Sequence, residues 1–170
     1  MEKLIITPTT VIDFKPAQPD DLPLVMAILA DAAVWLQAKE IDQWPSPLPA
    51  HWHQRMADKI GRGEMFTLGI VKNRFGIVSL SWADPYWPDD GQAGYVHRMA
   101  IRSSMHGQNL GGLILFWAQQ QVEKRGRPFL RLDCAAGNGR LRRYYEGQGF
   151  TYQSTITDHD YMAALYEKPI

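Results

Sequence analysis

Residues 95–150 read YVHRMAIRSSMHGQNLGGLILFWAQQQVEKRGRPFLRLDCAAGNGRLRRYYEGQGF, and the order of elements in this stretch decides the fold. Apolar residues alternate over Tyr95–Ile101, which predicts a β-strand. A glycine-rich turn follows at residues 106–112 and leads into an amphipathic helix that covers about Asn109–Lys124. The apolar run Phe129–Cys134 then predicts the next strand.

The turn at residues 106–112 predicts an anion site. Glycines let backbone N–H groups crowd around a phosphate, and the helix behind them adds unpaired donors and the positive end of its dipole. Two common phosphate motifs do not match. Residues 107–112, GQNLGG, lack the Gly-Lys-Ser/Thr ending of the ATP-binding loop and the G-x-G-x-x-G spacing of the dinucleotide fingerprint. An ordinary glycine-containing helix entry would give the same local pattern.

The turn and the segment after it resemble the GNAT acyltransferase superfamily. The pyrophosphate loop of that family has the pattern (Gln/Arg)-x-x-Gly-x-(Gly/Ala), on which His106 takes the first position, Asn109 the first glycine and Gly111 the last. Residues 138–150, NGRLRRYYEGQGF, resemble the signature N-x-x-A-x-x-(F/L)-Y-E-x-x-G-F, with Leu141 in place of alanine. His106 gives weaker charge support than arginine, whereas Asn109 tolerates a positive φ better than most residues.

The resemblance implies an α/β fold, in which a single GNAT-like domain over residues 1–170 has a mixed, mostly antiparallel central sheet flanked by helices. Residues 98–101, RMAI, resemble the R-L-A-V strand end of the family. Periodicity along the rest of the chain agrees with this fold. The expected helices cover residues 22–39, 50–61, 109–124 and 141–147, and the expected strands cover residues 11–15, 65–71, 75–82, 95–101, 129–134, 152–156 and 162–168.

Composition limits the partners that we expect. Eighteen basic and eighteen acidic side chains balance to a formal net charge of zero, so nothing global favours nucleic acid and a polyphosphate site must be local. The single cysteine, Cys134, excludes an internal disulfide framework, suits a reducing cytoplasm and reads as a small buried residue. No apolar run is expected to span a membrane. We expect a cytoplasmic protein, monomeric or homodimeric, with no nucleic-acid or membrane partner.

The resemblance implies an N-acetyltransferase that moves an acetyl group from acetyl-CoA to the primary amine of a small molecule by direct transfer. Two alternatives stay open. One is a non-catalytic acyl-CoA-binding module, and the other is an acetyltransferase that acts on protein N-termini or lysines.

The same resemblance assigns residues to coenzyme A. The amides of the strand end would contact the thioester and the pantetheine arm, the turn would hold the pyrophosphate, and Asn138 would contact the arm, although a turn-forming asparagine is an equal alternative. The predicted cofactor-binding residues are Met99, Ala100, Ile101, His106, Gly107, Gln108, Asn109, Leu110, Gly111, Gly112, Asn138 and Tyr145.

Tyr145 and His97 are the predicted catalytic pair. A phenol suits protonation of the leaving thiolate, because its pKa lies above that of a thiol. Side chains alternate along a strand, so Tyr95, His97 and Met99 are expected on one face, where His97 would accept the amine proton. A buried, hydrogen-bonded histidine is an equal alternative. Asp133 is a second candidate for the base.

Aromatic residues after the first helix and after the hairpin are expected to wall the acceptor pocket. Packing is the alternative for each of them. The predicted substrate-binding residues are Trp44, Trp82, Tyr86, Trp87 and Tyr95, and Asp84, Asp89 and Asp90 would attract a cationic amine. Trp35 and Trp117 are expected in the core. We assign no metal, because His51 and His53, two residues apart on a helix, point away from each other.

Overall fold

A mixed eight-stranded sheet forms the centre of the computed structural model, which describes residues 2–7 and 10–170. Its strands lie in the order β1-β2-β3-β4-β5-β6-β8-β7, and each neighbouring pair is antiparallel except β5 and β6. This confirms the predicted mixed, mostly antiparallel sheet. The strands are β1 (Glu2–Thr7), β2 (Thr10–Pro16), β3 (Met65–Ile70), β4 (Asn73–Ser81), β5 (Ala93–Ile101), β6 (Phe129–Ala135), β7 (Thr151–Asp158) and β8 (Tyr161–Pro169).

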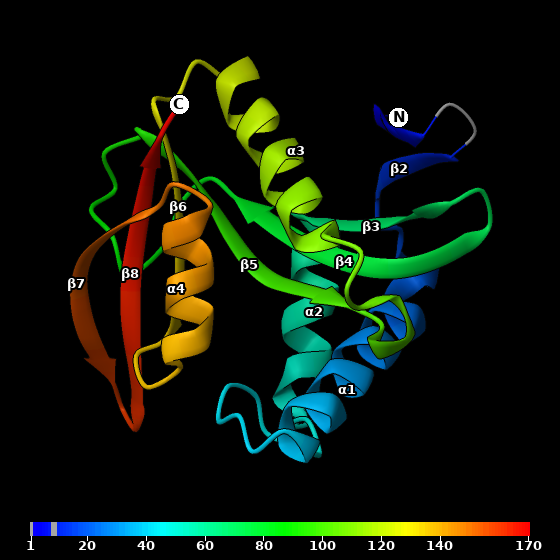
Figure 1. Ribbon diagram of the computed structural model, residues 1–170, viewed down its shortest axis with the longest axis horizontal. Helices are drawn as coiled ribbons and strands as arrows, with labels where there is room; N and C mark the ends of the chain where they lie inside the picture. The colour runs from blue at the N-terminus through cyan, green and yellow to red at the C-terminus, as the bar shows by residue number, and fades with distance from the viewer. Residues whose placement is uncertain (1, 8–9) are drawn as a thin grey trace.

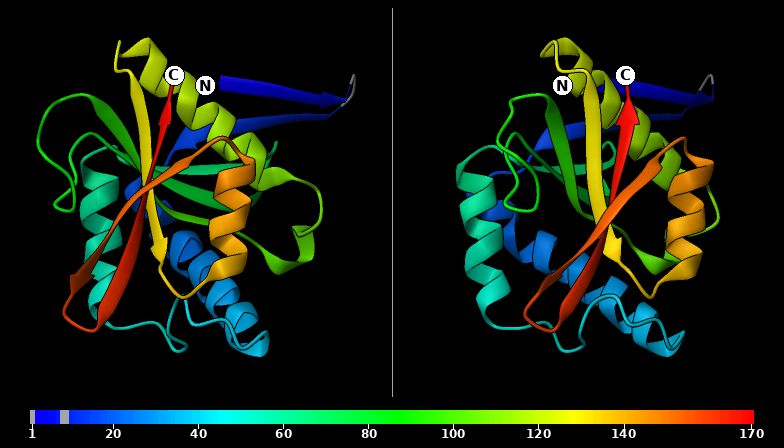
Figure 2. Two further views of the ribbon diagram at one scale, coloured as in Figure 1. Left: turned by 60° about the vertical axis from the view of Figure 1, so that its left-hand side comes forward. Right: turned by 90° about the vertical axis from the view of Figure 1, so that its left-hand side faces the viewer.

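Helices cover both faces of the sheet (Figures 1 and 2). Helices α1 (Leu22–Ala38) and α2 (His51–Gly61) pack on one face in a cluster with Met65, Ile77 and Ala100. Helices α3 (Leu110–Lys124) and α4 (Gly139–Gly147) pack on the other face in a larger cluster. Two short 3-10 helices occupy Pro19–Asp21 and Ser103–Met105.

Every predicted element is present to within about two residues at its ends, and β1 was not predicted. Trp117 is buried in the core against Phe14 and Phe66, as predicted. The expectation that no apolar run reaches membrane-spanning length was wrong, because Pro19–Ala38 is long and apolar enough, with a mean hydropathy of 1.4. In this fold that segment carries core residues of α1: Val25, Ile28, Leu29, Ala32 and Ala33.

The parallel strands β5 and β6 pair over only part of their length. Their register starts at Ala93 with Phe129 and stops at Val96 with Leu132, and the strands then part. Helix α3 follows β5 and α4 follows β6, so both helices start on the side where the strands separate (Figure 1). The separation opens a wedge at the carboxyl ends of the two strands, which is where α/β sheets bind their ligands.

A β-bulge interrupts β5 at the mouth of this wedge. Between the pairs Ile77–Ala100 and Ser79–His97, β4 has one residue but β5 has two, Arg98 and Met99. Arg98 is the bulged residue, with a φ of 49°.

The bulge changes which side chains share a face. Met99 packs with the α3/α4 cluster and Ala100 with the α1/α2 cluster. His97 lies opposite Ser79, on the α1/α2 face, and Arg98 reaches Trp52 of α2 on that same face. The prediction that Met99 shares a face with Tyr95 and His97 was therefore wrong, because the extra residue resets the alternation.

Candidate active site

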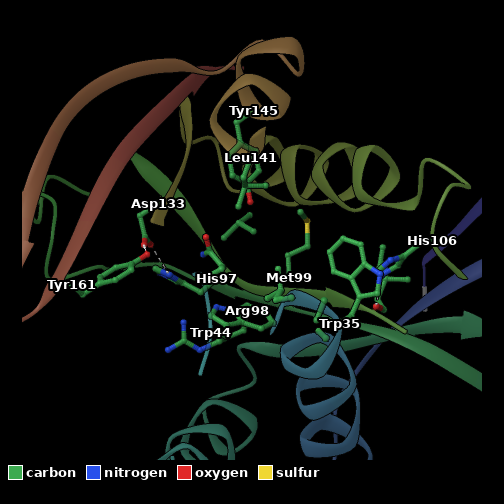
Figure 3. A pocket seen from close by; sticks show the side chains of 16 residues that line it. Trp35, Trp44, His97, Arg98, Met99, His106, Asp133, Leu141, Tyr145 and Tyr161 are labelled. Carbon is green, nitrogen blue, oxygen red and sulfur yellow. Dashed lines mark hydrogen bonds and ion pairs between the residues drawn. The ribbon is translucent and has the colours of Figure 1, made fainter. Parts of the chain in front are cut away.

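Two adjoining pockets open along the wedge. The first, of about 200 Å³, lies between α1, β5 and α4 (Figure 3), and the second, of about 770 Å³, lies between α2, the 83–86 loop and the β7–β8 turn. Both are lined by Gln43, Trp44, His97, Arg98, Asp133 and Tyr161. Because these residues belong to both walls, the two pockets adjoin at His97 and Asp133.

The turn before α3 presents unpaired backbone donors. The first hydrogen bond of the helix runs from the Leu113 N–H to the Asn109 carbonyl, at 3.4 Å. The N–H groups of residues 107–112 therefore have no protein acceptor among the residues that the structure describes. Gly107 and Asn109 both have positive φ, 84° and 54°, so the asparagine adopts the left-handed conformation that its position requires. Such a row of donors fits a pyrophosphate.

Gly111 makes a close contact with α4. A Cβ atom at this position would lie 2.5 Å from the Tyr144 hydroxyl, so only glycine lets the two helices approach this closely. The buried Tyr144 hydroxyl has no hydrogen-bond partner in the described part of the chain. This contact joins the anion-binding turn to the helix that carries Tyr145.

The predicted contacts for the cofactor arm divide into two groups. Met99, Ala100, Ile101 and His106 line the first pocket. Asn138 is not among the lining residues. Instead, its side chain caps α4 by accepting a hydrogen bond from the Leu141 N–H at 3.1 Å, and it donates to Gln43 at 3.3 Å.

Trp35 lies on the pocket wall rather than in the core, so the core prediction was wrong. It is half-buried and meets the His106 ring edge to face, with ring centroids 4.7 Å apart (Figure 3). His106 Nε2 lies 3.1 Å from the Ile101 carbonyl oxygen. The histidine ring is thus held against α1 and the end of β5.

Tyr145 points from α4 toward β5 in the first pocket (Figure 3). The residue is only 6% exposed, and burial raises the pKa of its phenol far above the usual value. No hydrogen-bond acceptor is present for its hydroxyl among the described residues. The phenol is therefore protonated at neutral pH, which is the form that a proton donor requires.

His97 lies between two carboxylates at the junction of the pockets. Its Nε2 is 2.7 Å from Asp84, and its Nδ1 is 3.4 Å from Asp133, which also accepts a hydrogen bond from the Tyr161 hydroxyl at 3.2 Å. Burial alone would lower the pKa of His97, but its hydrogen bonds to Asp133 and Asp84 outweigh burial and raise that pKa above 6.5. Burial would raise the pKa of Asp84, but the hydrogen bond from His97 holds it below the usual value.

Only some of the predicted substrate residues meet at the second pocket. Trp44 lines both pockets and Tyr86 lines the second. Tyr86 also donates a hydrogen bond from its hydroxyl to Asp158 at 2.8 Å, which ties the loop to the β7–β8 turn.

Trp82, Trp87 and Tyr95 line neither pocket. Trp82 lies under the Arg125 guanidinium at 3.9 Å, whereas Trp87 and Tyr95 both contact Arg131. Asp90 pairs with the same Arg131, and Asp89 is not a lining residue. Of the predicted loop carboxylates, only Asp84 reaches the site.

The pocket residues that had no predicted site role include Gln43, Trp52, Arg98 and Tyr161. Gln43 adjoins the predicted Trp44, which was the nearest signal. Tyr161 comes to Asp133 only because β8 pairs with β6, a contact between residues far apart in the chain. The side chain of Arg98 reaches the pockets because of the bulge, and the sequence has no glycine there that would indicate a bulge.

The described residues contain no group of three or more histidine, cysteine, aspartate or glutamate side chains that could hold a metal ion. Cys134 is fully buried, and burial, with a smaller effect from Asp133, raises the pKa of its thiol to about 12. The thiol is therefore protonated at neutral pH and is not positioned as a nucleophile.

Known proteins with similar sequences are acetyltransferases, which agrees with the geometry of the site. The sequence profile described as the acetyltransferase (GNAT) family matches residues 30–150. An uncharacterized N-acetyltransferase of Bacillus subtilis, YesJ, is 27% identical over 162 residues, which covers 91% of this chain and 88% of that protein.

Solved structures agree with the fold. A GNAT-family acetyltransferase from Listeria monocytogenes superposes with a TM-score of 0.81 at 22% identity, covering 99% of this chain and 100% of the other. The N-acetyltransferase PaiA from Thermoplasma acidophilum, solved in complex with coenzyme A, gives a TM-score of 0.68 at 15% identity, with 94% and 99% coverage. RimL, a ribosomal-protein α-N-acetyltransferase also solved with coenzyme A, gives 0.71 at 17% identity, with 99% and 98% coverage. The profile match over most of the chain, together with the shared fold, shows that this protein belongs to the acetyltransferase (GNAT) family of acyltransferase enzymes.

Proposed function

We propose that this enzyme transfers an acetyl group from acetyl-CoA directly to the primary amine of a small molecule. The observation that carries the proposal is the junction of two pockets at His97, with Tyr145 on the wall of the first. The second pocket has a volume of about 770 Å³, which is typical of a small-molecule site, and its walls come from several separate segments of the chain.

The turn and the strand end have the features that coenzyme A requires. When bound, acetyl-CoA would supply the acetyl group as a thioester. The N–H groups of residues 107–112 would hold the pyrophosphate, and the edge of β5 that faces the wedge would contact the arm. Met99 and Ile101 lie on that part of the strand, in the wall of the first pocket.

In direct transfer, the amine nitrogen attacks the thioester carbonyl, so a C–N bond forms and the C–S bond breaks. His97 in its neutral form takes the proton that the amine loses, directly or through water. Tyr145 gives its proton to the leaving thiolate. Asp84 and Asp133 stabilise the imidazolium that results and fix the orientation of the ring.

Asp133 remains the second candidate for the base, because it also lines both pockets. Titration separates the two candidates. Only a His97 base gives a pH profile whose inflection moves when Asp84, which raises the pKa of His97, is replaced by asparagine.

The proposal is tested by incubating the purified protein with acetyl-CoA and a panel of small primary amines, with peptides bearing free N-termini or lysines as a second panel. Product formation, followed by mass spectrometry and thiol release, is expected with members of the first panel. Transfer to peptides alone would replace the proposal with a protein acetyltransferase. Saturable binding of acetyl-CoA without transfer to any amine would indicate a binding module.

A further inference from the structure

Arg98 is a largely buried cation that has no ion-pair partner among the described residues. Its guanidinium carbon lies 4.3 Å from the centroid of the Trp52 ring, and no carboxylate of the described residues lies within ion-pair distance of it. Its Nε atom is buried and makes no hydrogen bond to any described residue. Buried donors without partners are rare in folded proteins, and a guanidinium that is not already paired can bind a carboxylate through two parallel N–H groups.

The wall of the second pocket has other charged groups, but most of them already have partners. Each of its acidic side chains contacts a donor: Asp58 with Gln54, Glu64 with Lys59 and Arg62, Asp84 and Asp133 with His97, and Asp158 with Tyr86. Among the cations, Lys59 and Arg62 share Glu64. Asp58 contacts only a neutral donor, and Asp84 and Asp133 share one histidine, so the wall as a whole is not positive. Arg98 and the exposed Arg55 are its cations without an ion pair within the described chain.

Burial lowers the pKa of Arg98, the neighbouring charge of Arg55 lowers it further, and Asp133 only partly opposes them. An arginine nevertheless stays protonated at physiological pH. The fold therefore keeps a positive charge in a partly dry pocket at a cost in free energy, which an anionic ligand would offset.

We propose that Arg98 binds a carboxylate of the acceptor, so that the substrate is an amino acid or a similar small molecule with an amine and a carboxylate a few bonds apart. This rests on the function proposed above. The β5 bulge places the side chains of His97 and Arg98 on the same face, and both line both pockets. An amine at His97 and a carboxylate at Arg98 would then lie on one small molecule.

The surrounding acids argue for a single negative charge on the acceptor. Asp84, Asp133 and Asp158 line the same pocket and would repel a phosphate dianion more strongly than a carboxylate. The planar fork of an arginine also matches a carboxylate through two parallel hydrogen bonds. Trp44, Trp52 and Tyr86 supply apolar surface for the rest of the acceptor.

The experiment compares each of a set of amino acids with its carboxamide, which has the same amine and side chain but no negative charge. The quantity measured is the ratio of kcat/KM for acid over carboxamide in the wild type, Arg98→Gln, Arg98→Lys and Arg125→Gln. Arg125 is a matched control, because its guanidinium also lies on a tryptophan, Trp82, but the residue lines neither pocket. Each ratio is taken on one protein sample, so it does not depend on the fraction that is folded.

The wild type and Arg125→Gln are expected to prefer the acid by roughly tenfold to a hundredfold, the range for a charge-assisted hydrogen-bonded pair. Arg98→Gln should lose that preference, and Arg98→Lys should keep part of it. The amine of a carboxamide is the weaker base and is more often unprotonated at neutral pH, so an uncharged pocket would favour the carboxamide. An equal or reversed ratio in the wild type, or an unchanged ratio in Arg98→Gln, overturns the proposal.

A binding measurement tests the carboxylate site even if the proposed acetyl transfer does not occur. If no amine is acetylated, calorimetric titration with the same acid and carboxamide pairs still tests Arg98. Tighter binding of the acid that disappears in Arg98→Gln supports the carboxylate site, and equal binding of both overturns it.

Discussion

At the scale of single residues, Tyr145, the proposed acid, and His97, the proposed base, have different surroundings. Tyr145 is buried among rings of Tyr144, Phe150 and Tyr166, so its proton is held tightly. His97 lies between two carboxylates that favour its charged form. Perturbed pKa values of two titratable groups in one pocket are typical of acid–base catalysis.

Tyr145→Phe should lower kcat by about 10²- to 10⁴-fold, the usual contribution of a general acid. The affinity for acetyl-CoA should change little, because the ring and its packing remain. Steady-state rates and calorimetric titration with acetyl-CoA measure the two effects. Tyr144→Phe is the control, since its hydroxyl has no partner and is not on the pocket wall. An unchanged kcat in Tyr145→Phe would remove Tyr145 as the acid.

The value of kcat/KM should rise with pH through an inflection above 6.5, because His97 must be neutral to accept the amine proton and its pKa is raised. Asp84→Asn removes one of the carboxylates that raise this pKa, so the inflection should move to lower pH. A pH profile of both proteins measures the shift. An inflection that stays at the same pH in Asp84→Asn would contradict its assignment to His97.

Protonation of His97 also makes the free energy of unfolding depend on pH, and the direction of this dependence can be predicted. His97 binds its proton more tightly in the folded chain than in the unfolded chain. Its contribution to the free energy of unfolding is therefore fully present below pH 6.5 and is lost as the pH rises through the raised value. The difference in the free energy of urea unfolding between the wild type and His97→Gln should shrink as the pH rises through this range, and a difference that does not change with pH would contradict the assignment.

At the scale of elements, the contact between α3 and α4 constrains position 111. Glycine usually costs about 0.5–1 kcal/mol relative to alanine inside a helix. Here a Cβ atom would meet the Tyr144 hydroxyl at 2.5 Å, while the next ring atom lies at 3.4 Å. The steric conflict therefore comes mainly from one oxygen atom.

Gly111→Ala should destabilise the fold by about 1–3 kcal/mol through overpacking. Tyr144→Phe removes the hydroxyl and should be nearly neutral, because that group has no hydrogen bond to lose. In the double variant the alanine should be tolerated, giving a coupling of about 1 kcal/mol or more by urea unfolding. Additive effects in this cycle would mean that the helices move apart instead.

The elements themselves could be predicted from the sequence, but their local irregularities could not. Period-2 and period-3.6 apolar patterns predicted every helix and all strands except β1, whose apolar residues Leu4, Ile5 and Ile6 are consecutive rather than alternating. The bulge at Arg98 was not predictable, because an arginine with positive φ leaves no compositional mark. Because the bulge was not predicted, Met99 was assigned to the wrong face of the sheet.

The candidate site was predictable where a motif is local and not where it depends on distant strands. The turn before α3 and the helix with Tyr145 were identified from contiguous residues. Trp35 was assigned to the core because it continues the apolar spacing of α1, whereas β5 and β6 part next to it. Trp82 and Trp87 were assigned to the acceptor pocket from their loop, which Arg127 and Arg131 hold against the sheet.

At the scale of the whole molecule, the sheet is continuous on both sides of the wedge but is not closed across it. Past Val96 and Leu132, β5 and β6 no longer pair with each other, so only the helices and the pocket residues connect the two parts there. A ligand that contacts both strands would add interactions that the folded protein has and the unfolded chain lacks, and it would stabilise the fold by mass action.

Acetyl-CoA at about 100 times its Kd should therefore add about 2.7 kcal/mol to the free energy of unfolding. For a chain of 170 residues this corresponds to a rise in Tm of roughly 5–10 °C. Differential scanning fluorimetry measures the shift. Pantetheine, which lacks the pyrophosphate, should give a much smaller shift at the same concentration. Equal shifts would contradict the assignment of residues 107–112 to the pyrophosphate.

The β5 bulge also means that Arg98 is the one residue of its strand that the sheet does not need. His97 and Ala100 on either side of the bulge already pair with β4, and one β4 residue lies between their partners, so a chain lacking residue 98 would place Met99 opposite that residue in an uninterrupted ladder. Such a chain would also lose a non-glycine residue from the left-handed region, which costs of order 1–3 kcal/mol. A deletion within a strand is usually the most damaging change. Deletion of residue 98 is expected instead to raise the free energy of unfolding and to change which acceptor the enzyme prefers.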